Sequence, residues 1–341
     1  MGAFELALCA GLLTAAAACD VGYDFGEASE AAGVTELTVT LTWLTVEPAE
    51  IADVYLSTAT STACNSGYFG AQFHPKTQSV LFSMWDNPQH VGATNRSDFP
   101  FQGMPASDNC WRNALDSTGK SSGVQCGQPW TRNPAVSKNV SFSFGAPYEF
   151  RLAMTMQNAS GALWEVTMFD PTDETTLSVG KIFFVDVPLG LPTTCRALGS
   201  SQNPPKQGLS AYTFLEYFEA PFDFTTIATW SNFTAVAPHD NKAYKPNVTK
   251  DCCGKTYGKP PTGAFLDTSR RCVPPECDDL ELTMMCGPFV RPSKSAVAAN
   301  PSCLKTSGEQ LVDSRDVTRM HDCWRDGPPS SLHECFADRT F

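Results

Sequence analysis

Two stretches of alternating apolar and polar residues, separated by a short polar segment, constrain the fold of this chain most. Apolar side chains occupy every second position from Tyr148 to Met156 and again from Trp164 to Met168. A period of two is typical of a β-strand with one buried face. Because residues 158–161 between the two stretches are Asn, Ala, Ser and Gly, the pattern predicts a β-hairpin that packs on a hydrophobic core.

The same period recurs over much of residues 36–236. Leu37, Val39, Leu41 and Trp43 alternate with threonines, and Val140, Phe142 and Phe144 are expected to share one face of a further strand. Shorter strand patterns occupy residues 54–57, 68–73, 80–85, 181–187, 212–218 and 227–236. Many short strands with little helical periodicity predict a mainly β fold, an antiparallel β-sandwich.

The composition changes near residue 250. Eight of the fourteen cysteines lie between Cys252 and Cys335, among prolines and glycines, with little strand alternation. So small a segment with so weak a hydrophobic pattern needs disulfides to fold, so we expect a small disulfide-rich module there. The expected organisation is a signal peptide at 1–19, a linker at 20–35, the sandwich at 36–240 and the Cys-rich module at 250–341. Residues 308–324 have a partial helical pattern.

The N-terminus predicts export. Residues 6–18 carry no charge and end in four small alanines, as a signal peptide does, although Glu5 stands where basic residues are usual. A buried N-terminal helix and a lipid-modified Cys19 are the alternatives. No later stretch approaches the roughly 18 apolar residues of a membrane helix, so we expect no membrane span in the mature chain and an extracellular location.

The cysteines and glycosylation sequons fit the same compartment. Cys110 and Cys126 are close in sequence, and we predict that they form a disulfide. Five Asn-x-Ser/Thr sequons are candidate N-glycosylation sites: Asn95, Asn139, Asn158, Asn232 and Asn247.

Charge and motif content argue against several classes of partner. The net charge is -12, with 24 Lys and Arg against 36 Asp and Glu, so the basic surface that nucleic acids require is missing. The five histidines have no paired metal-ligand spacing, and we expect no metal and no cofactor. Residues 119–123 match Gly-x-Ser-x-Gly, but without a strand before them and a helix after them they indicate a surface loop.

Two short elements resemble a family of uncharacterised extracellular proteins that contain a lectin-like β-sandwich domain of unknown function. The elements are Gly-Tyr-Phe-Gly-Ala-Gln at 67–72 and Phe-Ser-Met-Trp-Asp at 82–86. The resemblance extends over residues 36–236 and omits the Cys-rich segment. It implies a lectin-like sandwich and a carbohydrate-related setting, but no specific activity. The loop at 119–123 has no carboxylate, although an acidic residue is usual there in that family.

Pairs of an aromatic residue and a carboxylate are the candidate ligand-binding residues. Trp85 with Asp86, and Glu216 with Tyr217, each place a ring beside an acid near the end of a strand. Sugar rings stack on aromatic rings, and sugar hydroxyl groups donate hydrogen bonds to carboxylates. The alternative is that Trp85 is a buried core residue and that Asp86 is part of a turn.

The expected function is therefore extracellular binding of glycans or proteins, with no catalytic residue assigned. A carbohydrate-active enzyme with paired carboxylates, for which Glu149, Glu165 and Glu219 are further candidates, is one alternative. A structural matrix component is the other.

Overall fold

A computed structural model of the chain describes fifteen segments. They are residues 17–25, 34–47, 54–61, 66–74, 76–85, 103–112, 123–129, 134–159, 161–185, 210–217, 225–236, 243–245, 247–252, 264–267 and 282–286. These segments contain β-strands, turns and irregular backbone, and no helix, so the prediction of a mainly β fold is confirmed.

The first of two antiparallel sheets has eight strands in the order β15-β1-β12-β3-β4-β5-β8-β7. Their bounds are β1 Ala17–Asp24, β3 Val54–Ser61, β4 Ser66–His74, β5 Thr77–Trp85, β7 Cys110–Arg112, β8 Val124–Gln128, β12 Ser210–Tyr217 and β15 Asn247–Cys252. The strand order places β12, from late in the chain, directly beside β3.

The second sheet has nine strands, with eight in the order β16-β17-β13-β2-β9-β10-β11-β6 and β14 paired to β13. Their bounds are β2 Glu36–Glu47, β6 Gly103–Pro105, β9 Pro147–Asn158, β10 Gly161–Asp170, β11 Thr175–Val185, β13 Thr225–Val236, β14 Ala243–Tyr244, β16 Ala264–Asp267 and β17 Leu282–Cys286. The β9–β10 hairpin predicted from the alternation is present, and its strands meet at the Asn158–Gly161 pair.

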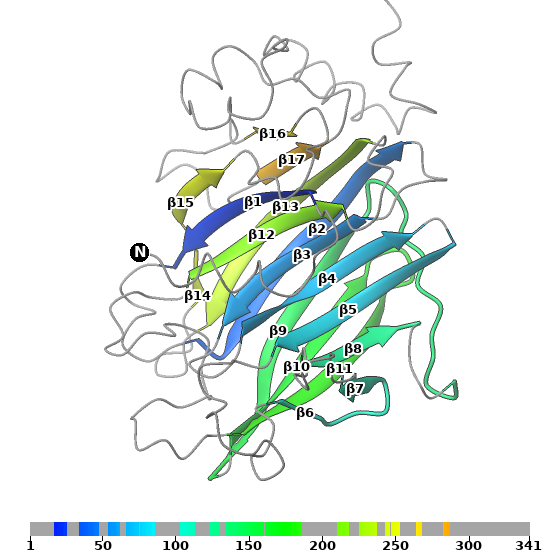
Figure 1. The fold of residues 1–341 in the computed structure, drawn as a ribbon, viewed down its shortest axis with the longest axis vertical. Helices are drawn as coiled ribbons and strands as arrows, with labels where there is room; N and C mark the ends of the chain where they lie inside the picture. Colours follow the sequence, from blue (N-terminus) through cyan, green and yellow to red (C-terminus); the bar gives the residue numbers. More distant parts are fainter. Residues whose placement is uncertain are drawn as a thin grey trace, which may run out of the picture.

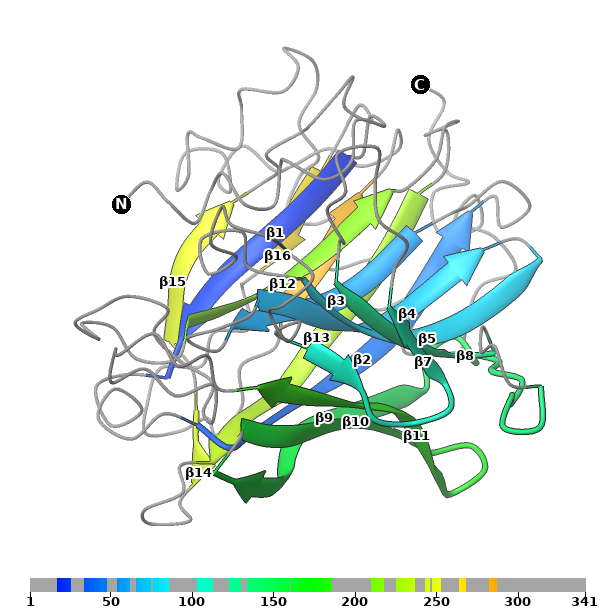
Figure 2. The same cartoon turned by 60° about the horizontal axis from the view of Figure 1, so that its bottom comes forward.

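The two sheets stack as a sandwich, which Figures 1 and 2 show as two layers of strands, with β12, β3, β4 and β5 in one and β13, β2, β9 and β10 in the other. One hydrophobic cluster lies between them. Its largest fully buried side chains are Trp43, Trp164, Trp230, Tyr148, Phe69, Phe82, Phe150, Phe184 and Phe233. Burying this apolar surface supplies the main driving force for the fold.

The alternation predicted the core positions of β2 and most of the hairpin. Leu37, Val39, Leu41 and Trp43 are all buried, as predicted. The alternation fails at the end of β9, where Met156 is 47% exposed. The pairing of β9 with β10 shifts register between Leu163 and Trp164, and such a bulge redirects the side chains beyond it.

Residues 140–144 differ from the predicted strand. Apart from one bridge between Val140 and Gln78, they form irregular backbone that leads into a turn. Phe142 is buried, but Phe144 is 38% exposed. The Ser143 amide donates to the Tyr148 hydroxyl at 2.7 Å, so a side chain satisfies backbone that a sheet would otherwise pair.

Residues that were predicted to lie outside the sandwich form strands of its two sheets. Residues 20–24, at the start of the predicted linker, belong to β1, and three strands from the C-terminal segment extend the two sheets at one end. The division into a sandwich and a Cys-rich module stays a prediction, and the helical pattern at 308–324 lies outside the described residues. The described segments contain no helix that is long and apolar enough to cross a membrane.

The predicted Cys110–Cys126 disulfide is present. It joins residues directly opposite each other on β7 and β8. Cys126 is fully buried, and the bridge lies against Gly180 on β11 of the other sheet.

Candidate functional site

The face of the eight-stranded sheet that points away from the core carries polar and aromatic side chains. Side chains of a strand alternate between the two faces, so Tyr55 and Ser57 lie opposite the core residues Val54 and Leu56. We call the following residues the polar-aromatic face: Tyr55, Ser57, Tyr68, Gln72, Ser79, Ser83, Phe214 and Glu216. Phe214 is buried but is not a member of the core cluster between the sheets.

Strand register aligns these residues in rows across the sheet. Glu216 on β12 lies opposite Tyr55 on β3, which lies opposite Gln72 on β4, which lies opposite Ser79 on β5. Cross-strand neighbours on one face are close enough for their side chains to touch. The Ser79 hydroxyl donates to the Gln72 amide oxygen at 3.4 Å, so these two buried groups satisfy each other.

The Tyr68 ring contacts two other aromatic rings of the face. The Tyr68 ring meets the Phe214 ring edge to face, with centroids 5.5 Å apart, and meets the Tyr55 ring in the same way at 6.5 Å. Edge-to-face contacts are favourable because the positive edge of one ring meets the negative face of the other. Burial and the nearby Glu216 carboxylate raise the pKa of Tyr68 above its ordinary range, so its phenol is neutral.

Glu216 is the carboxylic acid among the described side chains of this face. Burial raises the pKa of its carboxyl from 4.5 to about 7. A neighbouring cation would oppose such a shift. The carboxyl therefore changes between its charged and neutral forms near neutral pH. Glu216, Tyr55 and Tyr68 are each half-buried, so all three side chains keep access to solvent.

Ser57 on β3 and Gly70 on β4 form the row next to that of Glu216 and Tyr55. The Ser57 hydroxyl is buried and has no hydrogen-bond partner. Gly70 lies opposite Ser57, and a Cβ atom on it would overlap the Leu56 carbonyl oxygen and lie 2.7 Å from the Ser57 Cα. The pairing of β3 with β4 at the centre of the face therefore requires glycine.

The structure separates the predicted site residues. Glu216 belongs to the polar-aromatic face, and Tyr217 ends β12 opposite Val54. Trp85 ends β5 opposite Ser66, but its side chain and the whole of Asp86 lie outside the described residues. The predicted pairing of Trp85 with Asp86 as a ligand site therefore stays a prediction.

The other candidate carboxylates lie elsewhere or outside the described residues. Glu149 is exposed on β9 of the second sheet. Glu165, also on the second sheet, forms an ion pair with Lys181 at 3.1 Å and accepts a hydrogen bond from Ser178 at 2.9 Å. Glu219 lies outside the described segments. Among the described side chains of the polar-aromatic face, Glu216 is the single carboxylate.

Tyr55 and Tyr68 were not predicted as site residues. The available signal was the alternation of Tyr68, Gly70 and Gln72 with the apolar Phe69, Ala71 and Phe73. This alternation marks a polar face on β4, but it does not reveal that β12 brings Glu216 to that face.

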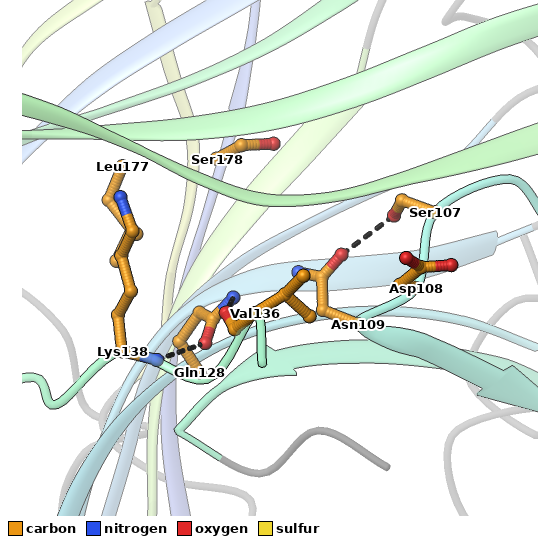
Figure 3. A pocket seen from close by; sticks show the side chains of 8 residues that line it. All are labelled: Ser107, Asp108, Asn109, Gln128, Val136, Lys138, Leu177 and Ser178. Atoms are coloured by element: carbon orange, nitrogen blue, oxygen red, sulfur yellow. Dashed lines mark hydrogen bonds between the residues drawn. The ribbon is translucent and has the colours of Figure 1, made fainter. Parts of the chain in front are cut away.

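A cavity of about 260 Å³ lies elsewhere, near one end of β8. Its lining residues are Ser107, Asp108, Asn109, Gln128, Val136, Lys138, Leu177 and Ser178. Figure 3 shows Lys138 and Asp108 at opposite ends of this cavity, with Gln128 and Asn109 between them.

The polar side chains at the centre of this cavity hold the backbone. The Gln128 amide donates to the Val136 carbonyl at 3.1 Å and accepts from the Lys138 amide at 2.9 Å. Asn109 donates to the Val179 carbonyl and accepts from the Ser107 hydroxyl. These contacts give the cavity a structural role, and the described residues contain no group of three potential metal ligands.

Three of the predicted glycosylation sites are placed with exposed side chains: Asn139, Asn158 and Asn232. Asn158 ends β9 at the hairpin turn, as expected for a glycan that leaves the strand pairing undisturbed. Asn232 has a positive φ of 52° within a bulge of β13, and its amide donates to the Thr40 hydroxyl at 3.2 Å. Asn247 begins β15, and Asn95 lies outside the described residues.

No protein-family model and no curated protein matches this sequence. Among solved structures, the chain is similar to the crystal structure of alginate lyase vAL-1 from Chlorella virus. The sequences are 8% identical, the match covers 60% of this chain and 84% of the lyase chain, and the TM-score is 0.23. So weak a likeness carries no argument, and the resemblance to a lectin-like family stays a prediction.

Proposed function

We propose that this chain is a secreted glycoprotein that binds glycans on the polar-aromatic face of its eight-stranded sheet. One observation carries the proposal: the half-buried Glu216 carboxyl lies beside two half-buried tyrosines on the face that is turned away from the core. Aromatic surface that stacks on sugar rings, combined with a few polar groups that fix orientation, is the usual composition of a sugar site.

The rigidity of the surroundings supports a preformed site. Glu216 and Tyr55 lie on paired strands in the interior of the sheet, and Tyr68 lies on the next strand. A ligand therefore orders few additional groups when it binds, which lowers the entropic cost of binding.

A glycan-array screen of the secreted protein tests the proposal. Glu216→Gln keeps the shape of the side chain and removes its charge, so a glycan bound at this face loses affinity. Glu149→Gln makes the same charge change on the other sheet and leaves binding unchanged. Binding that is equal in all three proteins, with the variants folded, would move the site away from this face. N-terminal sequencing and glycosidase treatment of the secreted product test export and glycosylation.

A carbohydrate-active enzyme is the second candidate, and the pKa of about 7 at Glu216 favours it. A carboxyl that titrates near neutral pH suits proton transfer. Hydrolysis of a glycosidic bond commonly requires two carboxylates, whereas the described part of this face has one. Incubating the array-positive glycans with the protein and analysing them for cleavage products distinguishes the two functions.

A further inference from the structure

Glu216 is in neither of the ion pairs that the described residues form, Arg151 with Glu36 and Lys181 with Glu165. Its neighbour in register on β3, Tyr55, is not a base, and the position opposite it on β1 is Ala18, which belongs to the predicted signal peptide. Among the described strand residues on this side of the sheet, His74 on β4 is a base, and β3 lies between its strand and that of Glu216. A half-buried carboxylate without a cationic partner carries an uncompensated desolvation cost, which a bound cation would remove.

The aromatic rings beside Glu216 favour a cation as well. Tyr55 lies opposite Glu216, Phe214 lies two residues before it on the same face, and Tyr68 contacts both of these rings. The faces of aromatic rings carry partial negative charge and attract ammonium groups. A carboxylate together with aromatic rings thus matches an alkylammonium in both charge and shape.

We propose that the glycan bound on the polar-aromatic face carries free amino groups, as in an amino sugar without its N-acetyl group, and that one ammonium pairs with Glu216 beside Tyr55 and Tyr68. The inference rests on the proposed function for the presence of a glycan, and it adds the chemical class of that glycan. A uronate or sulfate would place like charge against Glu216, and an acetylated amine would leave the carboxylate without a counter-charge.

Binding of the cation is coupled to ionisation of the carboxyl. The described titratable residues on this side of the neighbouring strands are Tyr55 on β3 and Tyr68 and His74 on β4, and Asp20 on β1 lies opposite Phe214. The phenol of Tyr68 stays neutral through the physiological range, whereas the pKa of the Glu216 carboxyl is raised to about 7. An ammonium ligand therefore displaces a proton from Glu216 when it binds.

The test compares two sugars that differ only in acetylation. Titration calorimetry at pH 7 with a glucosamine tetramer and an N-acetylglucosamine tetramer is expected to show a preference of about fivefold or more for the free amine. Glu216→Gln abolishes the preference, whereas the control Glu149→Gln retains it. Circular dichroism confirms that each variant is folded.

A second arm uses tetramethylammonium, whose charge does not change with pH. With a carboxyl pKa of about 7, its affinity rises roughly tenfold from pH 6 to pH 8 as Glu216 ionises. Glu216→Gln removes this dependence. A flat profile in the unmodified protein would contradict the proposed pairing with Glu216.

The outcomes separate this inference from the proposed function. If both tetramers bind equally, or the acetylated one binds better, the amine inference is wrong and glycan binding stands. If a lysine-containing peptide binds more tightly than the glucosamine tetramer and no glycan on the array binds, the glycan source and the proposed function both fail.

Discussion

The carboxyl group of Glu216 on β12 and the phenol of Tyr68 on β4 interact electrostatically across the intervening strand β3. Burial favours the neutral form of both groups. This relationship makes the pH dependence of stability a direct probe of the face.

The first prediction concerns the stability of the Glu216→Gln variant. Folded Glu216 keeps its proton up to about pH 7, whereas the unfolded chain releases it near pH 4.5. The folded state thus binds more protons between these values, and its stability falls as pH rises through this window. The amide that replaces the carboxyl cannot ionise, so the unfolding free energy of the variant does not fall in this way. We therefore expect the difference in unfolding free energy between the variant and the unmodified protein to grow by about 1–2 kcal/mol, in favour of the variant, from pH 4.5 to pH 8.

Urea unfolding of both proteins at a series of pH values measures this difference. Glu149→Gln again serves as the control, because that exposed carboxyl has no comparable burial. A difference in unfolding free energy that stays constant with pH would show that Glu216 is ionised normally in the folded protein.

A second prediction concerns the Cys110–Cys126 disulfide. The bridge closes a loop with a sequence separation of 16, and chain entropy makes such a closure worth about 3 kcal/mol. We expect the Cys110→Ala, Cys126→Ala double variant to lose about this amount in urea unfolding. Peptide mapping without reduction, performed on the unmodified protein, verifies the pairing. An unchanged unfolding midpoint would show that the unfolded chain gains no freedom from removal of the bridge.

Gly180 provides a third prediction, because it lies where the disulfide of one sheet meets a strand of the other. A Cβ atom on Gly180 would overlap the Cβ of Cys126 and lie 2.7 Å from its Sγ. We expect Gly180→Ala to lower the unfolding free energy by about 1–3 kcal/mol, since a packed interior cannot accommodate the extra methyl group. Thr176→Ala on the exposed part of the same strand is the control, with little expected change. A Tm equal to that of the control would mean that the sheets separate easily at this point.

Glycosylation at Asn158 and Asn232 is the subject of the fourth prediction. Asn158→Gln removes one glycan and changes stability by less than about 0.5 kcal/mol, because the residue is exposed at a turn. Asn232→Gln removes a glycan, the hydrogen bond to Thr40 and a residue type that tolerates a positive φ. We therefore expect it to lower the unfolding free energy by about 1 kcal/mol more than Asn158→Gln does.

Mass spectrometry and thermal unfolding of the secreted variants measure both effects. Thr234→Ala abolishes the Asn232 sequon but keeps the Asn232 side chain, which separates the contribution of the glycan from that of the bulge. If Thr234→Ala destabilises as much as Asn232→Gln, the glycan and not the backbone conformation accounts for the loss.

The strands could be predicted from sequence because burial on one face produces a local period of two. Leu37, Val39 and Trp43 are examples, since each is buried as the pattern requires. The pattern failed at Met156, where a register shift between paired strands depends on the partner strand and not on the local sequence. Proximity in sequence was enough to predict the bond between Cys110 and Cys126.

The candidate site was only partly predictable, for a reason of topology. Glu216 was identified because an aromatic residue follows it, but Tyr55 and Tyr68 reach it through the pairing of strands that are far apart in the chain. The alternation of residues along a strand predicts which of them share a face, but it does not predict which strands are neighbours.

The position of β1 has a consequence for maturation of the chain. Within the described strands, residues 17–19 pair with residues 215–217 of β12, whereas β15 pairs with residues 20–24. If cleavage after Cys19 takes place, as we predict from the N-terminal pattern, it would leave the pairing with β15 intact and uncover the backbone of β12 beside Glu216. Unpaired amide and carbonyl groups of this kind accept an added strand or an extended ligand. Export itself would thus create a new hydrogen-bonding edge next to the polar-aromatic face.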